Sequence, residues 1–157
     1  MKKLLLIAAM ALPLLVNAQI KNVSEMITLG ASTFNQVSEK LTKGSWKKYE
    51  EGKTDTQNYV RFIPVNMTAE NAGDNIMCFY QKKEKPVIYL VLQTMTKKTP
   101  DKLLAEAKKQ GFKFMAKENS NGQKKDIYSN GKCNISVVEG RQRPGEPLIY
   151  LFGVKYP

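Results

Sequence analysis

Hydrophobic and polar residues follow a helical period in two parts of the chain, and the first part is residues 22–44. Apolar positions recur there every three or four residues, which is the spacing of one helix face. The pattern starts at Asn22, with Glu25 three positions later as in a capping box, and it ends at Gly44. It predicts one helix. The positions of its buried face are Val23, Ile27, Gly30, Phe34, Val37 and Leu41.

The second helical pattern covers residues 99–111. Thr99 is expected to cap the helix, because Pro100 after it suits the first helical position, where a missing N–H costs nothing. An apolar stripe follows, and Gly111 ends it. The stripe consists of Leu103, Leu104 and Ala107.

Each helical segment is followed by four short segments in which apolar and polar residues alternate, as in strands. Turn residues separate the segments, and Asn130-Gly131 between two of them predicts a type I′ hairpin. The expected strands are 46–50, 58–63, 75–81 and 87–94 in the first half, and 112–117, 125–129, 132–138 and 148–155 in the second.

The two halves also share a short sequence. Pro86-Val-Ile-Tyr-Leu-Val91 and Pro147-Leu-Ile-Tyr-Leu-Phe152 lie 61 residues apart and match at four of six positions. Each closes a series of one helix and four strands. We therefore expect an α+β fold in which two tandem repeats, about 22–94 and 99–157, form one twisted antiparallel sheet with helices on one face.

This plan of a helix followed by four strands, given twice, resembles the fold of the secreted β-lactamase inhibitor proteins. It is also similar to that of small secreted bacterial proteins with a Gly-Phe-x-Phe rhythm, here Gly111-Phe112-Lys113-Phe114. The resemblance lies in the order of elements and implies a fold. It assigns no binding residue, because a shared fold does not establish a function.

The N-terminal residues 1–18 have the order of a signal peptide. Lys2 and Lys3 precede an apolar run, Leu4–Val16, which is too short to span a bilayer. Val16-Asn17-Ala18 then offers a cleavage site before Gln19. We expect residues 19–157 to be a single secreted domain, periplasmic or extracellular and not membrane-spanning.

The charge is strongly basic, with 25 Lys and Arg against 14 Asp and Glu. Such a protein can meet anionic envelope components, although lysines also keep a β-rich surface soluble. Nucleic acid is not an expected partner, because the chain carries an export signal and its lysine pairs are typical of turns. The partner is therefore an unidentified protein or an anionic envelope component.

Several kinds of chemistry are excluded by residue type. The chain has no histidine, which removes Ser-His-Asp and Cys-His catalysis and the usual zinc sites. It also lacks nucleotide-binding glycine motifs and calcium loops, so no cofactor or metal is expected. A small hydrolase using two carboxylates, such as Asp126 and Glu139, together with a tyrosine remains an alternative.

The two cysteines, Cys78 and Cys133, both fall in strand-like segments. Cys133, Ile135 and Val137 share one face of theirs. An exported protein can form disulfides, so the pair is either a disulfide or two buried free thiols.

The repeated hexapeptides suggest a binding surface. If the Ile and Leu of each turn toward the helices, the aromatics point to the open face. Tyr89, Val91, Tyr150 and Phe152 would then form a binding platform, unless they only pack across strands or the two faces are inverted. The sequence thus indicates an exported, non-catalytic binding module, the alternatives being the carboxylate hydrolase and a basic structural protein of the envelope.

Overall fold

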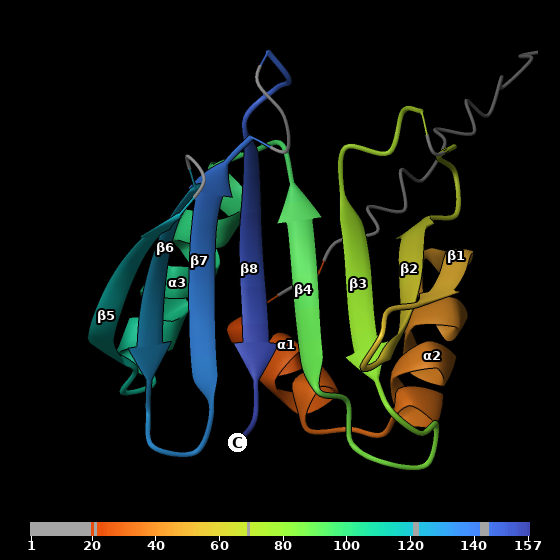
Figure 1. The fold of residues 1–157 in the computed structure, drawn as a ribbon, viewed down its shortest axis with the longest axis horizontal. Coiled ribbons are helices and arrows are strands. Elements are labelled where there is room, and N and C mark those ends of the chain that lie inside the picture. The colour runs from red at the N-terminus through yellow and green to blue at the C-terminus, as the bar shows by residue number, and fades with distance from the viewer. Residues whose placement is uncertain (1–19, 21, 69, 121–122, 142–144) are drawn as a thin grey trace, which may run out of the picture.

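The computed structural model of the chain describes residues 20, 22–68, 70–120, 123–141 and 145–157. The proposed signal peptide, residues 1–18, lies outside these residues. The described part forms three helices and one eight-stranded sheet (Figure 1). The helices are α1 (Val23–Gly30), α2 (Phe34–Lys43) and α3 (Lys98–Lys109), and the strands are β1 (Trp46–Lys53), β2 (Asn58–Pro64), β3 (Asn75–Tyr80), β4 (Tyr89–Thr94), β5 (Lys113–Ser120), β6 (Gln123–Ser129), β7 (Asn134–Gly140) and β8 (Ile149–Lys155).

All strand pairs are antiparallel, and the strand order is β1-β2-β3-β4-β8-β7-β6-β5. Each set of four consecutive strands is a meander, and the two meanders join through their last strands, β4 and β8. The two edges, β1 and β5, each carry a bulge, at Lys48/Glu50 and Phe114/Ala116. A bulge twists an edge strand and makes it a poorer template for pairing with another chain.

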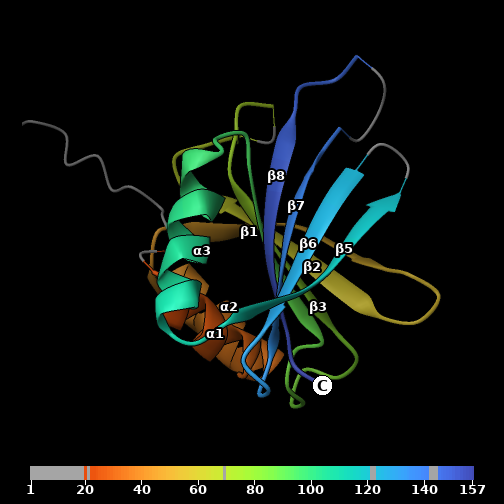
Figure 2. The same ribbon diagram turned by 90° about the vertical axis from the view of Figure 1, so that its left-hand side faces the viewer.

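The helices cover one face of the sheet, as Figure 2 shows. Helix α1 lies centrally and contacts β4, β8 and α3, while α3 also contacts β8 and α2 contacts β1. The other face carries no helix in the described residues. The predicted α+β fold with one twisted sheet and helices on one face is confirmed.

The first helical segment is two helices rather than the single one expected. Thr33 caps α2, because its hydroxyl accepts from the Gln36 N–H at 3.3 Å and the Gln36 side chain accepts from the Thr33 N–H at 3.0 Å. This capping box starts a new helix in the middle of the apolar pattern. The break is tied to the β3–β4 connection, where the Val87 N–H donates to the Ser32 carbonyl.

Two other local predictions need correction. Helix α3 begins at Lys98 and has no side-chain cap, so Thr99 is inside the helix. The β6–β7 hairpin has a four-residue loop after Ser129 rather than a two-residue type I′ turn. Asn130 explains the longer loop, since its side-chain oxygen accepts from the N–H groups of Lys132 and Cys133.

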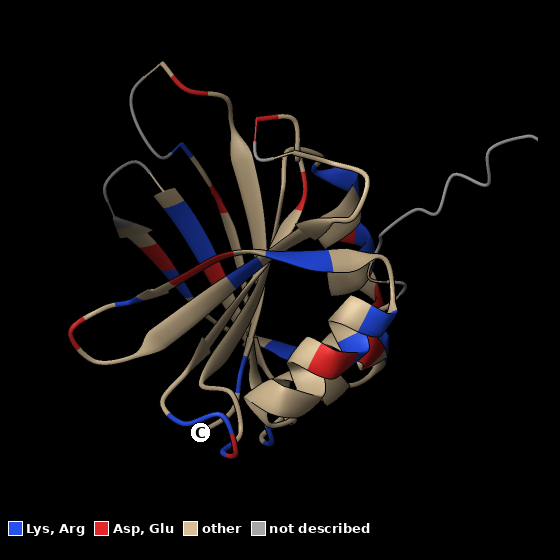
Figure 3. Cartoon of the chain, turned by 90° about the vertical axis from the view of Figure 1, so that its right-hand side faces the viewer, with Lys and Arg blue, Asp and Glu red and all other residues tan. Residues whose placement is uncertain are grey.

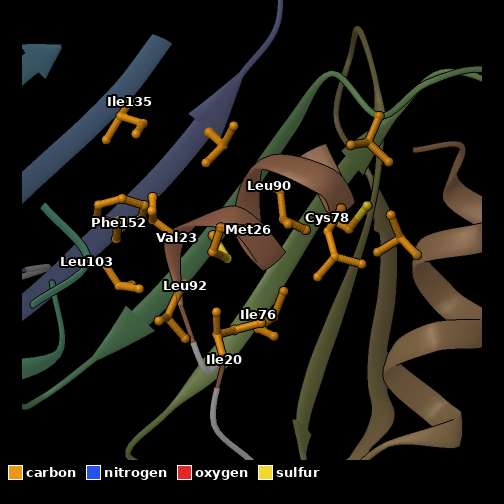
Figure 4. Close-up of a cluster of buried hydrophobic side chains, with 14 of the residues drawn as sticks. Ile20, Val23, Met26, Ile76, Cys78, Leu90, Leu92, Leu103, Ile135 and Phe152 are labelled. Carbon is orange, nitrogen blue, oxygen red and sulfur yellow. The ribbon is translucent and has the colours of Figure 1, made fainter. Parts of the chain in front are cut away.

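The core lies between the helices and the covered face of the sheet. Phe152 on β8, Val23 on α1 and Leu103 on α3 meet there, and their side chains lie together in Figure 4. The largest fully buried side chains come from all three helices and from five strands, so both halves contribute to a single core. They are Phe34, Phe62, Phe152, Met26, Leu29, Ile76, Leu90, Leu103, Ile135, Val23, Val37 and Val60.

The central pair of strands shows that the predicted facing of β8 is wrong. Leu90 pairs with Val154 and Leu92 with Phe152, and all four side chains belong to the core. Phe152 is fully buried under the helices, and Tyr150, two residues away, shares its face of the sheet. Leu151 therefore turns to the open face. The match between the two hexapeptides, 61 residues apart, is therefore one residue out of step with the facing of the strands, and a shift of one residue exchanges the two faces.

The order of elements in the two halves agrees with the predicted repeat. Each half has a helix followed by four antiparallel strands. The first half has α1 in addition. Equivalence of the two halves remains a prediction.

Both cysteines are free and buried, so no disulfide joins them. Cys78 lies in β3 and Cys133 directly precedes β7, and β4 and β8 lie between those strands. Three strand spacings of about 4.8 Å separate them, more than a disulfide can bridge. Burial raises the pKa of the Cys78 thiol to about 12, and it also raises that of Cys133. The thiols are therefore poor nucleophiles.

No helix in the described part of the chain has the length and the apolar character needed to cross a membrane.

Candidate functional site

The open face of the sheet carries a row of three aromatic side chains on neighbouring strands. Tyr59 on β2, Phe79 on β3 and Tyr89 on β4 are aligned in register. Their ring centroids are 6.2 Å apart at each step. All three are half-buried. Such spacing allows favourable aromatic contacts across strands and leaves part of each ring available to a ligand.

The row ends at Tyr89, which lies over a glycine. A Cβ atom placed on Gly153 of β8 would overlap the Tyr89 hydroxyl and ring, so only glycine leaves room for the ring here. The Tyr89 hydroxyl is hydrogen-bonded to the Ser136 hydroxyl of β7 at 2.5 Å. Burial raises the pKa of Tyr89, although the Ser136 hydrogen bond and the charge of Lys125 oppose part of the rise. Tyr89 is therefore a fixed, neutral hydroxyl at neutral pH.

A pocket of about 410 Å³ opens beside this tyrosine. It lies at the end of the sheet where β8 ends and β7 begins, and the connection between β1 and β2 also reaches it. Four strands separate β2 from β6, yet Gln57 and Lys125 line the same pocket, so the sheet curls toward its open face. The lining residues are Gln57, Ile88, Tyr89, Lys125, Ile127, Asn134, Ile135, Ser136 and Lys155.

A polar network borders the other end of the aromatic row. The Tyr59 hydroxyl donates to Glu50 at 2.8 Å, and Arg61 forms an ion pair with the same carboxylate at 3.1 Å. These bonds hold Tyr59 in place. The aromatic row thus has charged groups at its β1–β2 end and the pocket at its β8 end.

The four residues predicted from the sequence are not brought together. Tyr89 is on the open face as expected and lines the pocket. Val91 is on the same face, but it is only 2% exposed and offers little surface. Phe152 is in the core and Tyr150 lies on the helix side, so the four-residue platform does not form.

The sequence prediction missed Tyr59, Phe79 and Ser136. A signal for the first two was present, because they alternate with the buried residues Val60 and Cys78 of their strands. Alternation also placed Ser136 on the open face, but it could not reveal the partner of its hydroxyl, because Tyr89 lies on β4 with β8 between the two strands.

A second, smaller pocket of about 180 Å³ lies on the helix side near the start of α3. It brings together the two carboxylates named in the hydrolase alternative, Asp126 and Glu139, with Tyr150. Lys117 lies 3.7 Å from Asp126, and Lys97 lies 3.5 Å from Glu139. Each carboxylate therefore has a lysine as its ion-pair partner.

Basic and acidic segments are interspersed along the strands and turns in the view of Figure 3. Among the described residues, no group of three or more Cys, Asp or Glu side chains could hold a metal ion.

Comparison of the chain with protein-family models, with curated proteins and with solved structures finds no match. The resemblance to the β-lactamase inhibitor proteins thus depends on the order of elements alone.

Proposed function

We propose that the protein is an exported, non-catalytic binding module that holds a protein or another component of the cell envelope on the open face of its sheet. The observation that carries the proposal is the aromatic row Tyr59–Phe79–Tyr89 next to a 410 Å³ pocket, on the face that the helices leave uncovered.

The rigidity of the surface supports binding. Tyr89 is fixed by Ser136 and by the close approach to Gly153, and Tyr59 is fixed by Glu50. Side chains that are already ordered lose little conformational freedom when a ligand arrives, which favours affinity. Aromatic side chains also give a large contact area for few rotatable bonds.

The signal sequence and the basic charge support the choice of partner. An exported protein meets envelope proteins, glycans and lipids, many of which are anionic. Without Lys2 and Lys3 of the signal peptide, 23 Lys and Arg remain against 14 Asp and Glu, and this net charge of +9 favours encounter with them.

A capture experiment tests the proposal. Residues 19–157 are immobilised and exposed to envelope extract, and the retained protein and lipid are identified by mass spectrometry. The variant Tyr59→Ser/Phe79→Ser should retain far less than the wild type. Phe114→Ser is the matched control, because Phe114 is an exposed aromatic residue whose side chain packs against Tyr128 on the helix side. Equal retention by all three proteins would contradict the proposal.

A carboxylate-dependent hydrolase is the second candidate, favoured by the meeting of Asp126, Glu139 and Tyr150 around one pocket. Chromogenic ester and glycoside substrates test it. Turnover by the wild type that is lost in both Asp126→Asn and Glu139→Gln would support the hydrolase. Turnover that survives both substitutions would exclude these carboxylates.

A further inference from the structure

We propose that the pocket beside Tyr89 binds a small organic anion: a molecule with one carboxylate or phosphate head and a short apolar body. This inference rests on the proposed binding function and names the chemistry of the ligand.

The charge of the lining is the first argument. The pocket is lined by two lysines, Lys125 and Lys155, and by no Asp or Glu. Lys125 is paired with Glu118 at 2.9 Å, whereas no ion pair of Lys155 occurs among the described residues. An anion in the pocket would share Lys125 with Glu118 and would give Lys155 a partner. Hydrogen bonds to charged groups are among the stronger ones in proteins.

The two hydroxyls supply the second argument. Tyr89 and Ser136 each have one proton to donate, and their mutual bond at 2.5 Å uses only one of the two. The other proton is available to an acceptor in the pocket. Carboxylate and phosphate oxygens accept such bonds, while an amine head would find no carboxylate in the lining.

The apolar part of the lining is the third argument. Ile88 and Ile127 give the pocket hydrophobic walls, and the ring of Tyr89 adds to them. A volume of about 410 Å³ is at the lower end of the range for small-molecule sites. An ion without an apolar body would leave these walls in contact with water, so the lining suits an amphiphilic anion better than an inorganic one.

The pocket on the helix side shows that this combination is not general in the molecule. Its lining contains three carboxylates, Asp101, Asp126 and Glu139, together with three lysines. That mixture offers no preference for one sign of charge. Of these two pockets among the described residues, the one on the open face combines a purely basic charge with paired hydroxyls and apolar walls.

A matched series of six-carbon ligands tests the proposal by NMR titration of the uniformly ¹⁵N-labelled protein at fixed ionic strength. Hexanoate and hexyl phosphate should shift the backbone amides of Ile88, Ile127 and Ser136, and the two arms distinguish a carboxylate from a phosphate head. Hexanol and hexylamine, titrated over the same concentrations and followed at the same amides, should bind at least about tenfold more weakly, because they lack the negative charge. Equal shifts with all four ligands would overturn the choice of an anion.

Variants then locate the site. Lys125→Gln/Lys155→Gln should weaken anion binding at least about tenfold, because the loss of even one of its two charged hydrogen bonds would have that effect. The control Lys40→Gln/Lys98→Gln removes the same charge from exposed positions on α2 and α3 and should leave binding unchanged. Equal losses in both variants would show a non-specific charge effect and overturn the site.

The failure of this inference can be told from the failure of the proposed function. If Tyr59→Ser/Phe79→Ser loses envelope capture but no anion shifts the pocket amides, the open face binds something else and only the anion is wrong. If the wild type neither captures a component nor responds to any ligand, both proposals fall.

Discussion

The strands β4 and β8 lie side by side in the middle of the sheet, and one of the two similar hexapeptides runs into the start of each, yet the strands present it differently. In β4, Leu90 and Leu92 face the helices and Tyr89 faces the open side. In β8, Phe152 and Val154 face the helices, and Leu151 takes the open side. A sequence match of six residues thus did not determine which face each side chain takes.

The difference follows from what each face must hold. In the register of the two strands, Leu92 lies opposite Phe152, Leu90 lies opposite Val154, and Gly153 lies opposite Val91. This position puts the glycine under the Tyr89 ring, where no other residue leaves room. The tyrosine of β4 and the glycine of β8 are therefore complementary, and the pocket depends on the difference between the two strands.

The largest effect is expected at the residue whose face was predicted wrongly. Phe152→Ala should lower the free energy of unfolding by about 3–5 kcal/mol, because the ring is fully buried and its loss leaves a cavity. Leu151→Ala on the open face should cost only about 1 kcal/mol, since the side chain is half-exposed. Urea denaturation measures both. Similar costs, or a greater one for Leu151, would mean that β8 has the opposite facing.

The complementarity of Tyr89 and Gly153 predicts the next effect. Gly153→Ala should destabilise the protein by about 1–3 kcal/mol, as overpacking does, because the new methyl group displaces the Tyr89 ring. In a Tyr89→Ala background the same change should cost close to nothing. Gly73→Ala is the control, since a Cβ there meets only Met95, at 4.0 Å. An unchanged cost in the Tyr89→Ala background would show that the ring is not the obstacle.

The thiol of the first half predicts a pH dependence. The pKa of Cys78 is about 12 in the folded protein against 9.0 for an ordinary thiol, because the side chain is buried. The folded state holds this proton more tightly than the unfolded state does. The contribution of the protonated thiol to the free energy of unfolding is therefore complete below about pH 9 and is lost as the pH rises toward 12. At pH 10 the wild type should have lost about 1 kcal/mol more than Cys78→Ala, relative to pH 8. Identical pH profiles would show that Cys78 is not buried as a thiol.

The smallest effect is expected for the hydroxyl pair. Tyr89→Phe and Ser136→Ala each remove a hydrogen bond between half-buried or buried groups and should each cost about 1 kcal/mol. The double variant should cost less than the sum, because both changes remove the same bond. Chemical denaturation of the three proteins measures this. Strict additivity would mean that the two hydroxyls do not interact.

Much of the fold could be predicted because the strands and helix ends depend on sequence patterns of a few residues. All eight strands were found from period-two alternation, and the Asn22 cap on Glu25 was also correct. The break between α1 and α2 was missed although Thr33 and Gln36 have the spacing of a capping box, because the apolar pattern continues through them.

The site could be predicted only in part. Ile149, Tyr150, Leu151 and Phe152 are all apolar or aromatic, so alternation could not say which of them face the helices. The deciding residue was Gly153, whose partner lies on another strand. The pocket was not predictable for the same reason, since its two lysines come from β6 and β8, which are far apart in the sequence and lie on either side of β7.

The central claim is that Tyr89 lies over Gly153 on the open face while Phe152 lies under the helices. NMR of the aromatic rings tests it most directly. The account predicts nuclear Overhauser contacts from the Tyr89 ring to the α protons of Gly153 and to Ser136, with the Gly153 protons shifted by the ring current. It also predicts contacts from the Phe152 ring to Val23 and Leu103. Contacts from the Phe152 ring to Tyr89 instead, with none to Val23 or Leu103, would contradict the account.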